Sequence, residues 1–557
     1  MMTKSITGRS AFLQLLVDEG VSHLFGNPGT TELPLMEVIS RYPQLRYVLG
    51  LQESVVLAMA DGYSRASGRL SACNLHCAPG LGHAMGALYN AKFSGSPVLV
   101  TAGQHEIGHG LTEPLLYADL VAIAQPLVKW AVAVERIEDL PRIVHRAAKI
   151  ALAPPTGPVF ISLPGSILDD EAAIDMGSPS RVERATRPAD GVIADMAARI
   201  LRAERPVIVA GKELADHHAF DEACRFAECI GAPVYLSSVP YNARFPATHP
   251  LNMGEITRNQ ERVRATLSEH DLLVCLGGDL LRMSLHSRTD PLPDAMPLLH
   301  ICERDWELGK NYATEIAICA NVKETLRALL PVLESAKTPA YEAAAAGRRA
   351  AIEPKNWSAR RARHIAALAA KKDATPIWTE YLMARISEVI PAGAIVVEEA
   401  VSSASGLATV LKSDDPRSFY GIASGGLGFA LPGAIGVSLA HPGRPVVGVL
   451  GDGSAMYTIQ GLWTAAHLRL PITYIIVNNR GYRIIKDRLL ALRHTDAFVG
   501  MDLKDPAIDF VALGAGMGVR TARITDPAEI DGVLTRMMKG DGPSLIDVAV
   551  EDGFGNV

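Results

Sequence analysis

The sequence predicts three consecutive α/β domains, each built as a doubly wound parallel sheet. Short apolar runs rich in β-branched residues alternate with helical patterns along most of the chain, which is typical of parallel sheets. A chain of 557 residues is also too long for one hydrophobic core. The alternation lapses twice, at about 165–190 and 335–373, so the predicted domains are residues 1–175, 190–335 and 375–557.

The first predicted domain alternates helices and strands from its start. Apolar residues at helical spacing predict helices at 10–18, 54–66 and 82–92. Apolar runs that stop at glycine, histidine or proline predict the strands between them. These strands are expected at 21–25, 47–51, 70–75, 97–102 and 157–164.

The second and third domains continue the same alternation. Strands are expected at 206–211, 233–236, 272–276 and 298–302, and then at 394–397, 445–450, 472–477 and 544–548. One helix is expected after residue 450, with Met456, Ile459, Leu462, Trp463 and Ala466 on one side. The Ala-, Lys- and Arg-rich stretch 335–373 reads as a helical or mobile connector.

The composition is that of an ordinary soluble protein, with 48% hydrophobic and 20% charged residues. A net charge of −6 without a basic cluster argues against nucleic acid or an anionic membrane as a partner. No apolar run of 18 or more residues and no leader pattern is evident, so neither a membrane span nor export is expected. Seven cysteines, an odd number lying mostly in apolar runs, predict free thiols in a reducing cytoplasm.

The stretch Gly451-Asp452-Gly453-Ser454 joins a predicted strand to a helix, and Asn479 directly follows the next strand. Because parallel strands end at the same edge of a sheet, we expect Asp452 and Asn479 to converge. Such a site would offer Mg²⁺ one carboxylate, one amide oxygen and nearby backbone carbonyls, a ligand set that suits an ion bound to a diphosphate. Backbone N–H groups at the helix start would donate hydrogen bonds to the diphosphate itself. Alternatively, the first motif is an ordinary turn and the asparagines belong to a polar loop.

Three polar residues of the first domain also follow strands, so we expect them at one edge of its sheet. Glu53, at a helix start among apolar residues, is either an acid complementing the helix N-terminus or a carboxyl group in an apolar pocket. His76 is either a loop histidine bonded to the backbone or a catalytic group. Thr30 lies in a Gly-Asn-Pro-Gly turn and has either a turn or a substrate role.

The combination of GDG, a helix, a strand and NN resembles the thiamine diphosphate enzymes. The likeness extends to FGNPGTTELP, NLHCAPGLGHAMGALYNA and YGIASGGLGFALPGAIGVSLA, which look like segments of the benzoylformate decarboxylases. The similarity follows the domain order over nearly the whole chain and is weakest from about 165 to 375. It implies a pyrimidine-binding, a central Rossmann-like and a diphosphate-binding domain, with thiamine diphosphate and Mg²⁺ as cofactors.

The resemblance also implies roles for residues at matching positions. Glu53 matches the glutamate that hydrogen-bonds the aminopyrimidine ring and so activates the cofactor, and Leu427 matches the residue that holds the cofactor bent. The metal would be held by Asp452, Asn479 and the carbonyl of Gly481. The other cofactor-binding candidates are Ser402, Ser403, Gly425, Gly451, Gly453, Ser454 and Tyr482.

For the substrate, the resemblance implies that His76 handles protons and that Thr30 positions the carboxylate. The family pattern has a second catalytic histidine shortly after an arginine; here the candidate, His286, comes about two residues late. Gly421 stands where aryl-specific enzymes carry an aromatic wall residue. Ile484 replaces a smaller residue, and Ile485 keeps the aliphatic wall. The cofactor chemistry is therefore implied more directly than an aryl substrate.

Together these features predict non-oxidative decarboxylation of a 2-oxo acid, with benzoylformate or a related aryl acid as the expected substrate and carboligation as a side activity. The alternatives are an acetolactate synthase-like carboligase, an oxidase with FAD in the central domain, and a non-catalytic paralogue. The family places its cofactor between the first domain of one subunit and the third of another. A homo-oligomer is therefore expected, commonly a tetramer built as a dimer of dimers.

Overall fold

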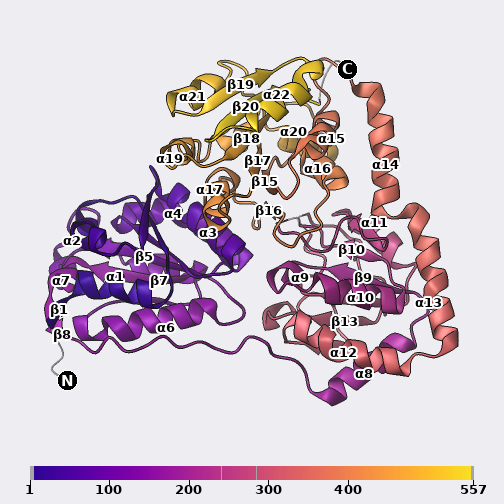
Figure 1. The fold of residues 1–557 in the computed structure, drawn as a ribbon, viewed down its shortest axis with the longest axis horizontal. Coiled ribbons are helices and arrows are strands. Elements are labelled where there is room, and N and C mark those ends of the chain that lie inside the picture. The colour runs from indigo at the N-terminus through magenta and orange to yellow at the C-terminus, as the bar shows by residue number, and fades with distance from the viewer. Residues whose placement is uncertain (1–4, 240, 284, 554–557) are drawn as a thin grey trace.

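The computed structural model describes residues 5–239, 241–283 and 285–553 and contains three six-stranded parallel sheets, each flanked by helices. Figure 1 shows the N-terminal domain in indigo, the central domain in magenta and the C-terminal domain in orange and yellow. The predicted fold class, three α/β domains in a row, is confirmed. All neighbouring strands within these three sheets run parallel.

The N-terminal sheet has the strand order β3-β2-β4-β5-β7-β6. Its strands are β2 (His23–Gly26), β3 (Arg46–Leu49), β4 (Ser71–Leu75), β5 (Val98–Gln104), β6 (Ala131–Ala133) and β7 (Val159–Pro164). Its helices are α1 (Gly8–Asp18), α2 (Leu33–Val38), α3 (Glu53–Ser67), α4 (Cys77–Ser94), α5 (Leu120–Ala124), α6 (Leu140–Leu152) and α7 (Gly165–Asp169). A small antiparallel pair, β1 (Ser5–Thr7) and β8 (Glu171–Ala173), joins the two ends of this domain.

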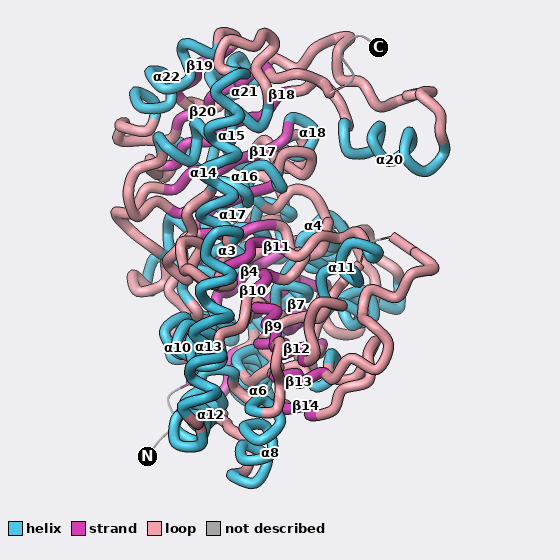
Figure 2. Tube along the Cα trace, turned by 90° about the vertical axis from the view of Figure 1, so that its right-hand side faces the viewer, coloured by secondary structure: helices cyan, strands magenta, loops and turns pink. Residues whose placement is uncertain are grey.

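The central sheet has the order β11-β10-β9-β12-β13-β14 of a dinucleotide-binding fold. Its strands are β9 (Pro206–Ala210), β10 (Val234–Leu236), β11 (Asn252–Glu255), β12 (Leu272–Leu276), β13 (Leu298–Ile301) and β14 (Ile316–Ile318). The helices α8 (Asp190–Leu201), α9 (Glu213–Asp216), α10 (Phe220–Ile230), α11 (Gln260–Leu267) and α12 (Val322–Ala336) surround it. The connector is helical: α13 (Pro339–Ile352) and α14 (Trp357–Leu368) run from the central towards the C-terminal domain (Figures 1 and 2).

The C-terminal sheet has the order β16-β15-β17-β18-β20-β19, which repeats the strand topology of the N-terminal sheet. Its strands are β15 (Ile395–Glu399), β16 (Phe419–Gly421), β17 (Val446–Gly451), β18 (Ile472–Asn478), β19 (Arg520–Ile524) and β20 (Ser544–Ala549). Its helices are α15 (Thr379–Val389), α16 (Ala404–Val410), α17 (Ala430–Ala440), α18 (Asp452–Ala455), α19 (Gly461–His467), α20 (Arg483–Arg493), α21 (Phe510–Gly516) and α22 (Ile530–Met537). Figure 2 shows α20 standing out from this domain.

Two expectations for the C-terminal domain are wrong. The single helix expected after residue 450 is broken into α18 and α19, and in the intervening turn the hydroxyl of Thr458 donates to the Gly428 carbonyl at 3.1 Å. Met456 consequently faces solvent. The outer strands β16 and β19 were not expected from the sequence. An edge strand such as β19, with Arg520 and Arg523, needs no continuous apolar run.

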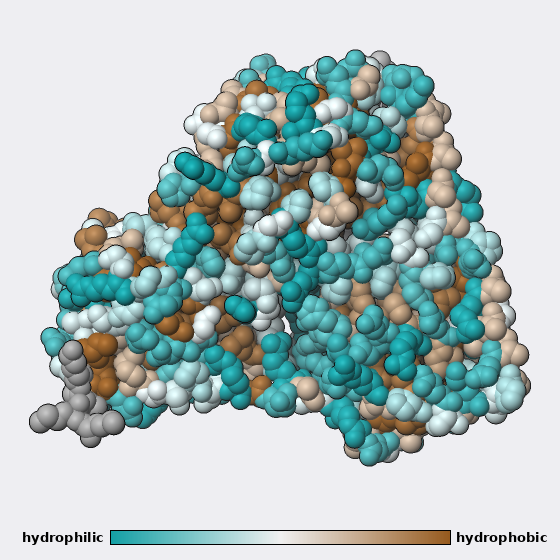
Figure 3. Space-filling view, viewed as in Figure 1, coloured by the Kyte–Doolittle hydropathy of each residue, from teal (hydrophilic) through white to brown (hydrophobic). Residues whose placement is uncertain are grey.

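The N- and C-terminal domains of the chain share one apolar core, in which α3 packs directly on α17. Glycines make this close crossing possible. A Cβ atom on Gly436 would lie 2.1 Å from the Met59 carbonyl oxygen, and one on Gly62 would lie 2.3 Å from the Gly433 carbonyl oxygen. The visible surface is mostly hydrophilic, with apolar residues gathered where these two domains meet (Figure 3). Among the described residues, no helix has the length and apolar character needed to cross a membrane.

Candidate active site

The predicted oxygen clamp forms at the carboxyl ends of β17 and β18. These strands pair in parallel with Gly451 opposite Val477, so Asp452 and Asn479 emerge next to each other. The backbone N–H of Gly481 lies 3.1 Å from Asp452 Oδ2 and 3.2 Å from Asn479 Oδ1, and both oxygens accept from it. The expected convergence of these two side chains is therefore present. It lies beside β15 and β17, where the strand order of the sheet reverses.

The electrostatics of the clamp fit a bound cation. Asp452 is only 4% exposed, and burial raises the pKa of its carboxyl group to about 6. Among the described residues no group of three His, Cys, Asp or Glu side chains could hold a metal, so the clamp offers one carboxylate, one amide and backbone carbonyls. Such hard oxygen donors suit Mg²⁺, whose remaining ligands are commonly water and phosphate. A divalent cation here would offset the cost of ionising the buried Asp452.

Two glycines shape the backbone beside the clamp. A Cβ atom on Gly453 would lie 2.6 Å from the ring of Tyr482, so the glycine lets this ring pack closely against the backbone. Gly425, in a left-handed conformation with φ of +82°, leads into the turn that carries Leu427. Glu399 holds this turn by accepting from the N–H groups of Gly428 at 2.5 Å and Ala430 at 2.6 Å. The sequence analysis assigned Glu399 no role, although an acidic residue at the end of an apolar strand could have marked it as a functional candidate.

A cavity of about 720 Å³ opens from the clamp towards the central domain, a size within the usual range for ligand sites. Most of the predicted cofactor and pocket residues line it: Ser402, Ser403, Gly425, Leu427, Gly451, Asp452, Gly453, Ser454, Asn479, Gly481, Tyr482, Ile484 and Ile485. Gly421 does not line it and lies one residue before Ile422, which does. The lining residues missed from the sequence include Tyr89, Phe93, Val239, Arg258, Arg282, Met283, Glu398 and Arg488.

The candidates of the first domain form a separate cluster at the edge of the N-terminal sheet. Glu53 is the first residue of α3, which Gln52 caps, and its Oε2 lies 3.0 Å from His83 Nδ1 and its Oε1 3.3 Å from Asn27 Nδ2. His76 Nδ1 lies 2.9 Å from the carboxylate of buried Glu32. A proton held on Nδ1 by this carboxylate leaves Nε2 as the free acceptor of the ring.

Two neighbours of His76 differ from the sequence expectation. Thr31, rather than Thr30, contacts the ring, with its hydroxyl 3.1 Å from Nδ1. Thr30 itself is exposed at the start of a short turn. Neither Glu53, His76 nor Thr30 lines the 720 Å³ cavity of the same chain, and exposed His286 does not line it either. Within one chain the clamp and the Glu53 cluster are therefore two separate halves.

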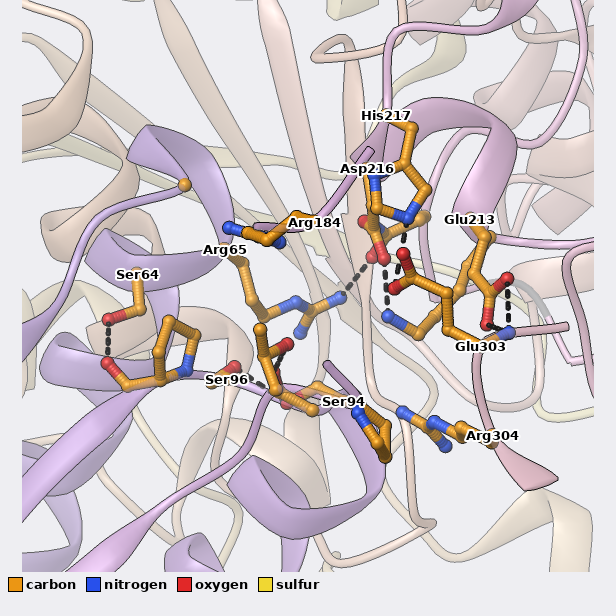
Figure 4. Close-up of a pocket in the computed structure, with 17 residues that line it drawn as sticks. Ser64, Arg65, Ser94, Ser96, Arg184, Glu213, Asp216, His217, Glu303 and Arg304 are labelled. Carbon is orange, nitrogen blue, oxygen red and sulfur yellow. Dashed lines mark hydrogen bonds and ion pairs between the residues drawn. The ribbon is translucent and has the colours of Figure 1, made fainter. Parts of the chain in front are cut away.

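A second cavity of about 80 Å³ lies between the N-terminal and central domains, at the carboxyl edge of the central sheet (Figure 4). Its charged groups compensate one another. Lys212 pairs with Asp216, and His217 Nε2 lies 3.1 Å from the Glu303 carboxylate. A Cβ atom on Gly211 would lie 2.3 Å from the Gly278 Cα, so the turns after β9 and β12 touch. This edge of the central domain is closed at the point where dinucleotide-binding folds hold their ligand.

Comparisons with known proteins agree with this geometry. Three family models match in domain order: the N-terminal TPP binding domain of thiamine pyrophosphate enzymes over residues 6–117, the central domain over 193–329, and the C-terminal TPP binding domain over 400–548. The chain belongs to the thiamine pyrophosphate enzyme family. The two TPP binding models support thiamine diphosphate as its cofactor.

The individual relatives include decarboxylases and acetolactate synthases. The chain is 32% identical to a benzoylformate decarboxylase of Pseudomonas aeruginosa, covering 98% of this chain and 99% of that one. The solved structure of a thiamine diphosphate-dependent 4-hydroxybenzoylformate decarboxylase from Rhodococcus jostii RHA1 matches with a TM-score of 0.87 and 32% identity, over 98% of this chain and 99% of that one. The large subunit of acetolactate synthase isozyme 1 from Escherichia coli is 26% identical over 98% of this chain and 94% of its own length.

Proposed function

We propose that the protein is a thiamine diphosphate- and Mg²⁺-dependent decarboxylase that converts a 2-oxo acid, of the benzoylformate type, to an aldehyde and CO₂. The observation that carries this proposal is the oxygen clamp of Asp452 and Asn479, which faces a cavity large enough for cofactor and substrate together. Similarity to two decarboxylases acting on benzoylformates supports the reaction class. Carboligation of the aldehyde product is the proposed side activity.

Each group of residues has a distinct task in this proposal. Asp452, Asn479 and the Gly481 carbonyl would hold Mg²⁺ and, through it, the cofactor diphosphate. Bound thiamine diphosphate supplies the electron sink that carbon–carbon bond cleavage requires. The carboxylate of Glu53 would hold and move a proton at the aminopyrimidine ring, and His76 Nε2 would move protons at the substrate oxygen.

The separation of the two halves of the site supports an active site shared between subunits. Leu111 and Leu115, in the loop after β5, are 94% and 85% exposed. Tyr457 and Ile485, on the rim of the cavity, are exposed as well. Exposed apolar side chains in such numbers indicate a surface that a partner covers. We therefore propose a homodimer, or a tetramer of two dimers, in which Glu53 and His76 of one chain complete the cavity of the other.

The rival activities have less support. An FAD-dependent oxidase would need a nucleotide in the central domain, where the turns at Gly211 and Gly278 touch and the neighbouring cavity is only about 80 Å³. An acetolactate synthase-like carboligase would share the clamp, and analysis of products separates it: free aldehyde and CO₂, or a coupled hydroxyketone. A cytoplasmic location is proposed because all seven cysteines are free thiols.

The deciding experiment is CO₂ release from a panel of aryl and alkyl 2-oxo acids with added thiamine diphosphate and Mg²⁺. The Glu53→Gln variant should lose nearly all turnover while its circular dichroism spectrum stays unchanged. Glu37→Gln, an exposed acid on α2, is the matched control and should behave as wild type. Wild-type activity in Glu53→Gln would overturn the proposed role of Glu53, and no CO₂ release from any acid would overturn the decarboxylase.

A further inference from the structure

The 720 Å³ cavity carries cationic side chains in addition to the clamp. Arg258 lies between β11 and α11 of the central domain, and Arg488 lies on α20. Arg488 follows Ile484 by four residues and Ile485 by three, so the three side chains share one face of α20. All three line the cavity. The arginine is therefore part of the same wall as the two isoleucines.

The two arginines line the same cavity from different domains. Burial lowers the pKa of Arg258, the Glu255 carboxylate acts against this by raising it, and the Arg488 cation lowers it. Arg258 Nε donates to the Ser238 carbonyl at 2.8 Å. This bond leaves the terminal nitrogens of the guanidinium for another partner.

Among the described residues, neither arginine has a carboxylate within ion-pair distance. Glu255, which raises the pKa of Arg258, lies 2.6 Å from Arg244 and pairs with it. Glu398 lines the cavity too, but burial raises the pKa of its carboxyl group to about 8, so it is mostly uncharged at neutral pH. Among the described residues, Arg488 has no ion pair or hydrogen bond from its side chain.

The third arginine of the cavity shows the contrast. Arg282 pairs with Asp279, lies 3.8 Å from the Glu307 carboxylate, and stacks over the Phe93 ring. The 80 Å³ cavity is likewise compensated by its own acids. Among the described residues that line this cavity, Arg258 and Arg488 thus differ from Arg282 in having no ion-pair partner. An anionic ligand in the cavity would supply one.

We propose that Arg258 and Arg488 bind an anionic group at the far end of the substrate, so that the substrate is a 2-oxo acid with a second carboxylate on its side chain. This inference rests on the proposed decarboxylase function and specifies its substrate class. Arginine suits the task because its planar guanidinium binds a carboxylate with two parallel hydrogen bonds. A neutral aryl or alkyl side chain would leave both cations without an anionic partner.

The test uses two pairs of 2-oxo acids that differ mainly in the second carboxylate: 4-carboxybenzoylformate against benzoylformate, and 2-oxoadipate against 2-oxohexanoate. With cofactor and Mg²⁺ present, kcat/KM for the charged acid should exceed that for its neutral partner at least about tenfold in one pair. The Arg488→Met and Arg258→Met variants should each lower this ratio by about 10- to 100-fold. Arg493→Met, on the same helix but outside the cavity, removes an equal charge and should leave the ratio unchanged.

Different results would overturn different claims. Preference for the neutral acid in both pairs, or a ratio that neither variant changes, overturns the second-carboxylate inference while leaving the decarboxylase intact. No CO₂ from any of the four acids overturns the decarboxylase. The anion site is then judged by calorimetric titration of adipate and hexanoate into the protein. Tighter binding of adipate that is lost in Arg488→Met supports the site, and equal binding of the two acids rejects it.

Discussion

Replacing Asp452 by asparagine should stabilise the metal-free protein at pH 8 and abolish its response to Mg²⁺ and thiamine diphosphate. Burial raises the pKa of this carboxyl group from 3.8 to about 6. At about 1.4 kcal/mol per pKa unit, ionised Asp452 costs the folded state about 3 kcal/mol. Asparagine carries no charge, so this cost disappears in the variant. The Gly481 N–H, which lies 3.2 Å from Asn479 Oδ1, still has that oxygen as an acceptor. We expect a net gain of about 1 kcal/mol, since Asp452 accepts from the N–H groups of Gly453 and Gly481 and the single amide oxygen of asparagine can keep only one of these bonds.

The pH dependence has a definite sign. The folded-state pKa lies above the unfolded one, so the folded state binds the proton more tightly and loses stability as the pH rises from about 4 to above 6. The gain in the free energy of unfolding from removing the charge in Asp452→Asn should therefore be near zero below pH 4, about half of its full value at pH 5 and complete at pH 8.

The assay is urea unfolding at pH 5 and pH 8, with EDTA and without cofactor, followed by the same measurement with Mg²⁺ and thiamine diphosphate. Ligands at about one hundred times their Kd should stabilise the wild type by about 2.7 kcal/mol and leave the variant unchanged. A variant less stable than wild type at pH 8 without metal would refute the reasoning from burial. An undiminished cofactor effect would refute the assignment of Asp452 to the clamp.

Two further predictions concern packing and catalysis. Gly436→Ala should lower stability by about 1–3 kcal/mol or more, because its Cβ atom would meet the Met59 backbone at 2.1 Å and force α3 and α17 apart. Gly532→Ala, in the open on α22, should not lower the thermal midpoint, and equal midpoints for the two variants would contradict the close crossing. Glu32→Gln should lower kcat about 100-fold without weakening cofactor binding, because the partner of His76 at 2.9 Å loses its charge. Steady-state kinetics with a calorimetric cofactor titration measures both quantities, and an unchanged kcat would remove Glu32 from the mechanism.

The clamp could be predicted from the sequence because its geometry is local. Gly451-Asp452 and Asn479 directly follow two strands that are adjacent in a parallel sheet, and such strands end at one edge. The three α/β domains followed from alternating apolar and helical patterns for the same reason. Edge strands such as β19 escaped prediction, because solvent exposure overrides local preference. The break between α18 and α19, where the Thr458 hydroxyl donates to the Gly428 carbonyl, escaped prediction as well.

The sequence by itself predicted the oxygen clamp, since spacing along the chain is enough to bring an aspartate and an asparagine together, and the resemblance of its motifs implied thiamine diphosphate. Only the tertiary structure decided which side chains face the cavity. Arg258 comes from the central domain and Arg488 from α20, 230 residues later, and no local pattern relates them. The same holds for the separation of Glu53 and His76 from the clamp within one chain. Long-range packing, rather than local chain geometry, sets both arrangements.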